Sequence, residues 1–399
     1  MKILIQKFGG TSVATKERRA MVVQKVKSAK EQGFSPVVVV SAMGRKGDSY
    51  ATDTLLSLIN SDFKNSNLKA ADMLLSCGEI ISSVVMANDL YDNGIKSCPL
   101  TGGQAGIITD NNFNDAEVLN VDTKNIISIL KEGVVPVVTG FQGLTEDGYF
   151  TTLGRGASDF SASLLGVALK AEEIQIYTDV DGIMTADPRL VEEAYIIDKI
   201  TYNEVFQFAD QGAKVIHPRA VEMAMKGNIP LVIKNTMTDA KGTLIDNYGT
   251  GSSKKLFTGL TYMNNRIQVR FKSDDNRNND NYYNILDILA ENNISIDLIN
   301  IFPNEQIFTI DEICIAKLKE IVEALNLNCT YSDRCTKVAL IGNGIKGVPG
   351  VMAKIIKVLK NNNIEVLQTS DSHTTIWCLV HSSDAKKALN IIHDTFMVN

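Results

Sequence analysis

The chain has 399 residues, of which 44% are hydrophobic, and 40 Lys and Arg stand against 46 Asp and Glu, for a net charge of −6. This length predicts two or three domains with sizeable cores, and the acidic balance argues against a protein that binds mainly to nucleic-acid phosphates. No run of about 18 apolar residues indicates a membrane span, and the N-terminal apolar stretch is too short for a secretory signal.

The six cysteines are scattered without a C-x-x-C pair, and the four histidines are widely spaced. We therefore expect reduced, buried thiols rather than a disulfide scaffold or a zinc cluster, which favours the cytoplasm. No two histidines have the spacing of metal ligands on one helix face, so the sequence gives little support to histidine-based chemistry.

Short β-branched runs alternate with helix-like segments up to about residue 240. The helical candidate Thr15–Gln32 precedes a glycine that predicts its end, and the valine run Val37–Val40 is continuous rather than alternating. Continuous runs are typical of strands buried on both faces, so we expect an α/β domain with a mainly parallel sheet covered by helices. The strand candidates are Lys2–Lys7, Pro36–Ser41, Val134–Thr139, Glu173–Thr178 and Ile229–Lys234.

The second part of the chain follows a stretch rich in glycine and serine at residues 240–255, which indicates a linker or exposed loop. Beyond it, Ile285–Ile296 aligns with Ile355–Val366 at a constant offset of 70 residues. Each copy has the pattern of a helix, an Asn-Asn turn and a strand, which predicts a pair of small α/β modules. The polar stretch Ser273–Asn281 is expected to be an exposed loop.

The first motif suited to phosphate chemistry is Lys7-Phe8-Gly9-Gly10-Thr11-Ser12, between a predicted strand and a predicted helix. Its two glycines let the backbone approach a ligand closely, and Lys7 adds a full positive charge. An ordinary strand–turn–helix glycine pair is the plainer interpretation of the same residues.

Three further motifs carry polar residues. Thr152–Asp159 surrounds an arginine with small residues, so that its guanidinium can meet a carboxylate. Tyr177–Arg189 begins where a predicted strand ends, which is where open α/β sheets bind ligands. Gly212–Arg219 supplies Lys214 as a second candidate phosphate cation. A helix cap, a polar loop and a surface lysine are the plainer interpretations of these three.

The stretch Gly342–Gly347 matches the dinucleotide pattern G-x-G-x-x-G. We do not interpret it as a nucleotide site, because the chain after Glu365 is too short to complete such a fold. The following helix and strand also have a repeat partner that lacks the glycines. The sequence contains no P-loop and no protein kinase catalytic loop.

Taken together and in order, the motifs resemble the aspartokinase family over nearly the whole chain, and the region Ser41–Leu55 is most similar to the Gram-positive aspartokinase I subgroup. The tail resembles tandem ACT modules of that family, with Gly347–Val351 as a loop-to-helix entry. The matching elements are Lys7–Ser12, Val39–Gly44, Gly78-Glu79, Gly154–Asp159, Thr178–Ile183, Ala186–Arg189 and Gly212–Pro218.

The resemblance implies an amino acid kinase fold over residues 1–246 and two ferredoxin-like ACT modules at 257–335 and 336–399, with residues 257–271 able to interleave with the second. It implies ATP-dependent phosphorylation of the L-aspartate side-chain carboxylate to 4-phospho-L-aspartate, the first step toward lysine, threonine and methionine. It further implies feedback by lysine, threonine or diaminopimelate, a homodimer or homotetramer, and Mg²⁺ carried mainly by ATP rather than by protein ligands.

The resemblance also assigns roles, with Glu79 on the aspartate amine and Arg155 on its α-carboxylate. The residues expected to act in catalysis are Lys7, Asp159 and Lys214. Those expected to bind ATP are Lys7, Gly9, Gly10, Thr178, Asp179, Met184, Asp187, Arg189, Lys214 and Val215. Those expected to bind aspartate are Ser41, Thr52, Glu79, Arg155, Gly156 and Ser158. Those expected to contact an effector are Asp297, Gly350 and Val351.

The chemistry agrees with a site that has two lysines and no histidine base. The side-chain carboxylate of aspartate is ionised at pH 7, so the reaction needs alignment and charge neutralisation rather than a general base. The chain departs from the family at Ala157, where glycine is usual, at Phe160-Ser161 and at Met184. Ala157 would be strained if its φ were positive.

Two other hypotheses stay open at this point. One is an amino acid kinase that acts on another acidic substrate, such as glutamate or a carbamate. The other is a ligand-sensing protein with an inert kinase-like domain. The presence of both Glu79 and Arg155 favours an amino acid substrate, and Lys7, Asp159 and Lys214 favour an active enzyme.

Overall fold

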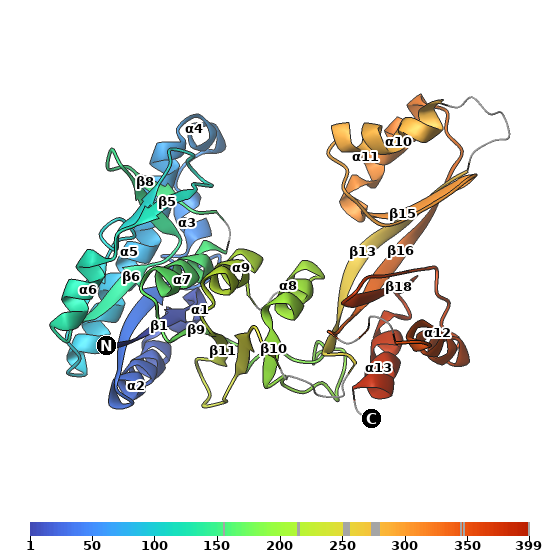
Figure 1. The fold of residues 1–399 in the computed structure, drawn as a ribbon. Coiled ribbons are helices and arrows are strands. Elements are labelled where there is room, and N and C mark those ends of the chain that lie inside the picture. Colours follow the sequence, from blue (N-terminus) through green and yellow to red (C-terminus); the bar gives the residue numbers. More distant parts are fainter. Residues whose placement is uncertain are drawn as a thin grey trace. The chain divides into compact units, whose positions relative to one another are not determined.

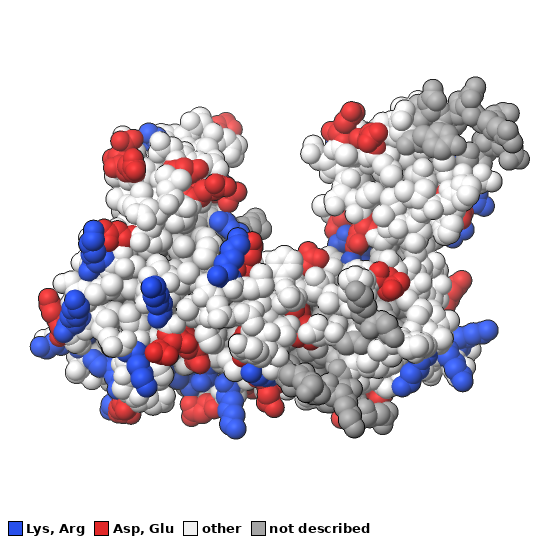
Figure 2. All heavy atoms as spheres, in the orientation of Figure 1, with Lys and Arg blue, Asp and Glu red and all other residues white. Residues whose placement is uncertain are grey.

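The computed structural model describes residues 1–154, 156–213, 216–249, 256–272, 280–343, 345 and 348–397. The chain forms two compact units, each described by itself below (Figure 1). The first unit comprises Met1–Ile183, Ile196–Ala209 and Lys214–Ser253, and the second comprises Met184–Tyr195, Asp210–Ala213 and Lys254–Asn399. On the face shown in Figure 2, basic and acidic side chains of the described residues are intermingled.

The elements of the first unit follow one another in an α/β alternation. In chain order they are β1 (Lys2–Phe8), α1 (Gly10–Val13), α2 (Lys16–Glu31), β2 (Phe34–Val40), α3 (Thr52–Leu56), α4 (Ser61–Ser66), α5 (Leu68–Asp92), β3 (Ser97–Leu100), β4 (Ile107–Thr109), β5 (Val118–Val121), α6 (Lys124–Lys131), β6 (Val135–Thr139), β7 (Gln142–Thr145), β8 (Phe150–Thr152), α7 (Ala157–Ala168), β9 (Glu173–Thr178), β10 (Lys199–Thr201), α8 (Tyr202–Asp210), α9 (Pro218–Gly227), β11 (Leu231–Asn235) and β12 (Thr243–Asp246).

An eight-stranded sheet of order β10-β12-β11-β9-β1-β2-β6-β3 forms the centre of this unit, and a smaller sheet of order β5-β4-β7-β8 accompanies it. The five strands predicted from the sequence are β1, β2, β6, β9 and β11, and neighbours among them pair in parallel. The valines at 37–40 are fully buried, so the interpretation of continuous runs as two-sided burial is confirmed. The expected linker is wrong over Thr243–Asp246, which forms β12 and pairs with β11.

Helices cover both faces of the large sheet. One face, with Phe8, Val38 and Val40, shares a core with α2 and α5. The side chains on the opposite face include Ile5, and α7 packs there against β1 so closely that a Cβ added to Gly166 would lie 3.5 Å from Ile5. The side chain of Thr15 accepts a hydrogen bond from the amide of Arg18 and caps the N-terminus of α2.

The helix α5 has 25 residues and a mean hydropathy of 1.5 over an 18-residue window, enough to cross a membrane by length and composition. Within the described part of the chain, 56% of that window is buried inside the protein. Its inward face combines apolar residues such as Leu75 and Met86 with the carboxyl groups of Asp72 and Glu79. This pattern identifies a core helix that carries polar residues into the unit.

The second unit contains a helix–strand pattern that occurs twice. In chain order its elements are β13 (Gly259–Lys272), α10 (Asp280–Glu291), β14 (Ile296–Phe302), β15 (Glu305–Asp311), η1 (Glu312–Cys314), α11 (Ile315–Ala324), β16 (Cys329–Ile341), α12 (Val351–Asn361), β17 (Gln368–Asp371), β18 (Thr375–His381) and α13 (Ala385–Phe396).

These strands form one six-stranded sheet of order β14-β15-β13-β16-β18-β17. The long strand β13 serves both halves: Gly259–Met263 pairs with Lys337–Ile341 of β16, and Arg266–Lys272 pairs with β15. Two separate cores result, one under α10 and α11 and one under α12 and α13. Along the chain, the first copy of the pattern therefore lies between β13 and β16, two long strands that pair with each other and serve both halves of the sheet.

The 70-residue repeat predicted from the sequence is confirmed by matching local geometry. The two Asn-Asn turns place Asn293 and Asn363 at φ of 57° and 56°. Lysines at equivalent positions cap the preceding helices, because Nζ of Lys317 donates to the carbonyl of Asn292 (2.7 Å) and Nζ of Lys387 donates to that of Asn362 (2.6 Å). The predicted loop Ser273–Asn281 lies outside the described residues up to 279, and α10 begins at Asp280.

Two segments that precede β13 in the sequence belong to the second unit. In Met184–Tyr195, the carbonyl of Thr185 accepts the amide of Leu260 (2.7 Å). In Asp210–Ala213, Oε1 of Gln211 accepts the indole N–H of Trp377 (2.9 Å). Residues from the predicted kinase region are therefore part of the unit that contains the repeat.

Candidate active site

One cavity of the first unit, which we call the Glu79 pocket, gathers side chains from distant parts of the sequence. Its volume is about 300 Å³. It is lined by Lys7, Gly10, Ser41, Ala42, Gly44, Thr52, Glu79, Phe141, Gly156, Ala157, Ser158 and Asp159. The strands β1 and β2 run parallel and end here, at the edge of the sheet where such folds bind ligands. Every described residue that the sequence analysis assigns to aspartate binding lies in this lining.

A buried ion pair fixes the cation of the pocket. Nζ of Lys7 lies 2.6 Å from Oδ1 of Asp159, and the two side chains are only 11% and 15% exposed. Lys7 comes from β1 and Asp159 from the first turn of α7, so the ion pair connects the end of a central strand with the start of a helix. An ammonium held this way is positioned in advance for a ligand anion, because its partner carboxylate restricts its rotamers.

Glu79 contributes a carboxyl group with one oxygen unused. Its Oε1 accepts the amide N–H of Ala42 (3.1 Å), while Oε2 is buried and has no hydrogen-bond partner among the described residues. Burial raises the pKa of Glu79 to about 8. A buried, unpartnered carboxyl oxygen beside a cavity is suited to receive a cationic group of a ligand.

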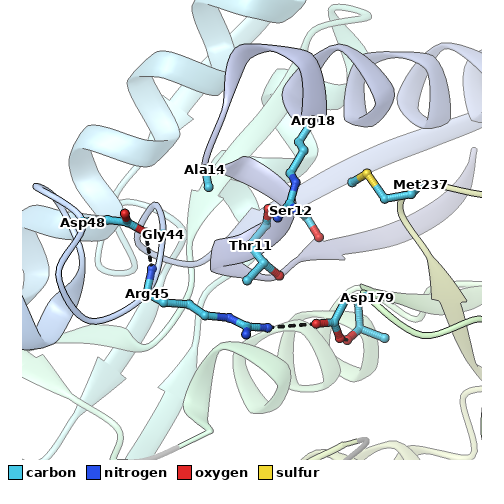
Figure 3. A pocket seen from close by; sticks show the side chains of 10 residues that line it. Thr11, Ser12, Ala14, Arg18, Gly44, Arg45, Asp48, Asp179 and Met237 are labelled. Carbon is cyan, nitrogen blue, oxygen red and sulfur yellow. Dashed lines mark hydrogen bonds and ion pairs between the residues drawn. The ribbon is translucent and has the colours of Figure 1, made fainter. Parts of the chain in front are cut away.

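A second cavity, which we call the Arg45 pocket, adjoins the first at Gly44, which lines both. Figure 3 shows the side chains that line the Arg45 pocket. Its volume is about 360 Å³. Thr178 and Asp179, at the carboxyl end of β9, lie here, as expected for candidate nucleotide-binding residues. The complete lining is Thr11, Ser12, Ala14, Arg18, Gly44, Arg45, Asp48, Thr178, Asp179 and Met237. Two adjoining cavities with a phosphate-type motif between them fit a reaction that has a donor and an acceptor.

Comparisons with known proteins identify the family. The Amino acid kinase family matches residues 2–235, and the ACT domain family matches residues 330–394. The chain is 43% identical to Aspartokinase 1 of Bacillus subtilis over 401 residues, which covers 99% of both chains. The chain belongs to the aspartokinase family. It is therefore an aspartate kinase, an enzyme that phosphorylates the side chain of aspartate at the expense of ATP, and the two other hypotheses fall.

Solved aspartokinases share the whole fold. Aspartokinase III of E. coli in complex with lysine and aspartate superimposes with a TM-score of 0.81 at 26% identity, over 99% of each chain. The same protein in complex with aspartate and ADP gives a TM-score of 0.75 at 26% identity, over 100% of each chain. The predicted fold class, an amino acid kinase domain followed by ACT structure, is confirmed.

Asp72 positions the loop that leads to the Glu79 pocket. Its carboxylate is fully buried and accepts the amide and hydroxyl of Thr152 (both 2.8 Å) and the amide of Asn114 (3.0 Å). Thr152 ends β8, and the aspartokinase motif at 154–159 follows directly. Burial raises the pKa of Asp72, and the three hydrogen bonds oppose that rise.

We expect Asp72→Ala to destabilise the enzyme by about 2–4 kcal/mol, because two backbone N–H groups lose their acceptor inside the protein. Urea unfolding at neutral pH measures this loss. The matched control is Asp53→Ala on the exposed side of α3, for which we expect a change within about 0.5 kcal/mol. Equal stability of the two variants would show that Asp72 does not anchor the loop.

The departures of this aspartokinase from its family pattern have local explanations. Ala157 begins α7 and its φ is not positive. The backbone strain that a positive φ would cause at this alanine therefore does not arise. The positive φ of 71° falls on Gly156 instead, where an added Cβ would lie 2.1 Å from His217. Phe160 packs under the guanidinium of Arg219, 4.5 Å from its ring centroid.

The other expected ATP-binding residues lie elsewhere or outside the described residues. Met184, Asp187 and Arg189 belong to the second unit. There Arg189 forms a bidentate pair with Asp187, whose Oδ2 also accepts the hydroxyl of Tyr262 (3.1 Å). Those hydrogen bonds lower the pKa of Asp187. Arg155, Lys214 and Val215 lie outside the described residues. Gly9 is in place beside Lys7, and its amide donates to Tyr177 (3.3 Å).

The expected effector residues occupy two places in the second unit. Asp297 lies on β14, and its carboxylate pairs with Nζ of Lys337, a lysine whose side chain is 2% exposed. Gly350 has a φ of 84° and precedes α12, whose first residue is Val351. Asp297 is therefore engaged in an ion pair within the second unit.

Sequence reasoning missed several residues that shape the site. Arg219 donates to the carbonyl of Leu153 (2.8 Å) and so holds the same loop as Asp72. Phe141 lines the Glu79 pocket with a φ of 69°, a left-handed conformation that is rare for a bulky residue. Arg18 and Arg45 line the other pocket. Arg45 and Arg219 lie in stretches that the sequence analysis singled out without giving either residue a role. The contact of Arg219 with Leu153 forms only in the folded chain, whereas that of Arg18 with Thr11 is local.

Proposed function

We propose that the Glu79 pocket binds L-aspartate and the Arg45 pocket binds ATP. Glu79 receives the α-ammonium group, Ser41, Thr52, Gly156 and Ser158 surround the substrate, and Arg155 holds the α-carboxylate as the family resemblance implies. The observation that carries this proposal is the unpartnered Oε2 of Glu79, which lines the same cavity as the Lys7–Asp159 pair.

Phosphoryl transfer then follows from positioning and charge. The side-chain carboxylate of aspartate attacks the γ-phosphorus as an anion, so no residue has to remove a proton. Lys7, held by Asp159, compensates the charge on the transferred group, and the backbone at Gly10 lets that group approach. We assign Thr178 and Asp179 to the nucleotide, and Lys214 to its phosphates on the basis of the family resemblance.

We propose that the Mg²⁺ ion of the reaction arrives bound to the nucleotide. Among the described residues, no three His, Cys, Asp or Glu side chains lie together as metal ligands. Mg²⁺ commonly keeps water and phosphate oxygens as ligands, so we assign it mainly to ATP. When bound, it would neutralise negative charge on the phosphates.

A coupled assay tests this function: ADP release with ATP is expected to depend on L-aspartate. Succinate, which has the two carboxylates and lacks the amine, is expected to be a poor acceptor, since it leaves Glu79 without a partner. L-glutamate in place of aspartate tests the length of the pocket. Equal rates with succinate and aspartate would contradict the role of Glu79.

We propose that an end-product amino acid regulates the enzyme through the ACT modules. The lysine complex of E. coli aspartokinase III supports this proposal. Lysine, threonine and diaminopimelate are each to be added to the assay, and Asp297→Ala is expected to weaken the response. A rate that none of the three changes would show the regulatory proposal to be wrong.

We propose a homodimer, or a tetramer of such dimers, formed through β14. This strand is the outermost of its sheet, and Ile301 and Phe302 on it are 61% and 51% exposed. Gln368 of β17 donates to Leu298 and Asn300 of β14, but no strand of the described residues pairs along this edge. A strand at the end of a sheet with exposed apolar residues invites a second copy. We also place the enzyme in the cytoplasm, because all six cysteines are unpaired.

Ile301→Lys is expected to shift the enzyme to a monomer, because it places a charge in the apolar contact. Light scattering coupled to gel filtration measures the mass. Ile313→Lys is the matched control: Ile313 is 86% exposed and lies off the strand, in η1. If the control dissociates as readily as Ile301→Lys, the interface is not at β14.

A further inference from the structure

The two arginines of the Arg45 pocket have no role in the function proposed so far. Arg45 reaches across the cavity, where its Nη2 lies 2.8 Å from Oδ2 of Asp179 (Figure 3). Both side chains are largely exposed, at 70% and 58%. An exposed ion pair contributes little to stability because water screens it, so this pair can be exchanged for a stronger partner.

Arg45 stands at the junction of the two pockets. Its neighbour Gly44 lines both, and the amide of Gly44 donates to the carbonyl of Gly10 (3.0 Å). A Cβ on Gly10 would lie 2.5 Å from the carbonyl of Ala42, so the two backbones pack without room for a side chain. A phosphoryl group that moves from one pocket to the other has to pass the contact between Gly10 and Gly44, which lies within reach of Arg45.

The loop holds Arg45 ready for such a contact. The carboxylate of Asp48 accepts the backbone amide of Arg45 (2.7 Å), which fixes the chain and leaves the guanidinium to the pocket. Arg18, from the first turn of α2, also points into this cavity, and its Nη1 donates to the carbonyl of Thr11 (2.8 Å) (Figure 3). Within the described part of the chain each guanidinium makes one hydrogen bond, which leaves most of its donors to a ligand. Planar guanidinium groups match phosphate oxygens in pairs.

We propose that Arg45 and Arg18 bind the polyphosphate of the nucleoside triphosphate, and that the Arg45–Asp179 pair is the resting state that the nucleotide opens. Arg45 exchanges the carboxylate for a phosphate group, and Asp179 is released toward the sugar hydroxyl groups. This inference rests on the proposed function only in placing the nucleotide in the Arg45 pocket. No covalent step is involved.

Calorimetric titration of the full-length enzyme with ATP, without aspartate, tests the arginines directly. Arg45→Met is expected to weaken ATP binding by about tenfold or more, and Arg18→Met by a similar or smaller factor. Lys46→Met is the matched control, because Lys46 is the next residue, carries the same charge, is exposed and lies outside the lining. The KM for aspartate is expected to stay unchanged in Arg45→Met.

Inorganic tripolyphosphate separates phosphate binding from a structural role, since it lacks the sugar and base. Asp179→Asn is expected to bind tripolyphosphate more tightly than the wild type, because Arg45 is no longer neutralised, while Arg45→Met binds it more weakly. A purely structural ion pair would make both variants weaker. Thermal unfolding of each variant confirms that it is folded.

The outcomes distinguish the two proposals. If the wild type releases ADP with aspartate and Arg45→Met binds ATP and tripolyphosphate like the wild type, the inference is wrong and the proposed function stands. If the wild type shows no aspartate-dependent release, the proposed function is wrong. The tripolyphosphate titrations then still decide whether the arginines form a phosphate site.

Discussion

Replacing Lys7 by Ala is expected to lower kcat by about 10³-fold while the enzyme stays folded, because one positioned cation that meets developing charge contributes a factor of this order. The side chain is almost enclosed and lies 2.6 Å from Asp159, so water cannot supply an equivalent charge at the same point. Single-turnover phosphorylation of aspartate with saturating ATP measures the chemical step without interference from product release.

Lys2→Ala is the matched control, since Lys2 begins the same strand and is exposed at its other end. The double variant Lys7→Met with Asp159→Asn distinguishes catalysis from charge balance. If Lys7 served only to neutralise Asp159, the double variant would recover activity; we expect it to stay as slow as the single variant. Normal turnover in a folded Lys7→Ala enzyme would refute the role assigned to this residue.

The sequence predicted the large sheet well, because burial on both faces leaves a pattern within each segment. Predicting the strands Pro36–Ser41 and Glu173–Thr178 needed no knowledge of the rest of the chain, and the bounds of β2 and β9 match them within two residues. Thr243–Asp246 was mistaken for linker, because it is a short strand between glycines and its pairing with β10 and β11 is not local. The repeat was visible because both copies use the same turn chemistry.

The site was predictable only as a set of motifs. Each motif contains residues that indicate ligand binding, such as glycines that allow close approach. Lys7 and Thr178 could therefore be predicted as site residues, because they lie in such motifs at the ends of strands. The residues that were missed act through partners far along the chain: Asp72 accepts from Thr152, and Arg45 pairs with Asp179. The motifs next to Asp72 and Arg45 do not indicate these contacts, because only the folded sheet brings the partners together.

Glu79 makes aspartate binding dependent on pH. Its pKa of about 8 means that the carboxyl group is mostly protonated at pH 7 in the free enzyme. The α-ammonium of aspartate favours the ionised form, so binding releases a proton. The KM for aspartate is therefore expected to fall as pH rises from 6 to 8, by up to tenfold per unit, and to level off above 8. The KM for ATP, measured in parallel, provides a comparison, since Glu79 does not line the Arg45 pocket.

Glu79→Gln is expected to abolish this pH dependence and to weaken aspartate binding, while Glu204→Gln, a change at another buried glutamate, leaves both unaltered. Glu79→Gln is also expected to be more stable than the wild type at high pH. A pKa raised from 4.5 to about 8 means that the native state binds more protons than the unfolded state between these values, so wild-type stability falls as pH rises through that window. Glutamine carries no proton to lose, and we expect it to gain about 1–3 kcal/mol over the wild type at pH 9, measured by urea unfolding at pH 5 and 9. A stability difference that does not change with pH would mean that Glu79 is ionised in the free enzyme, and the proton released by aspartate would then have to come from another group.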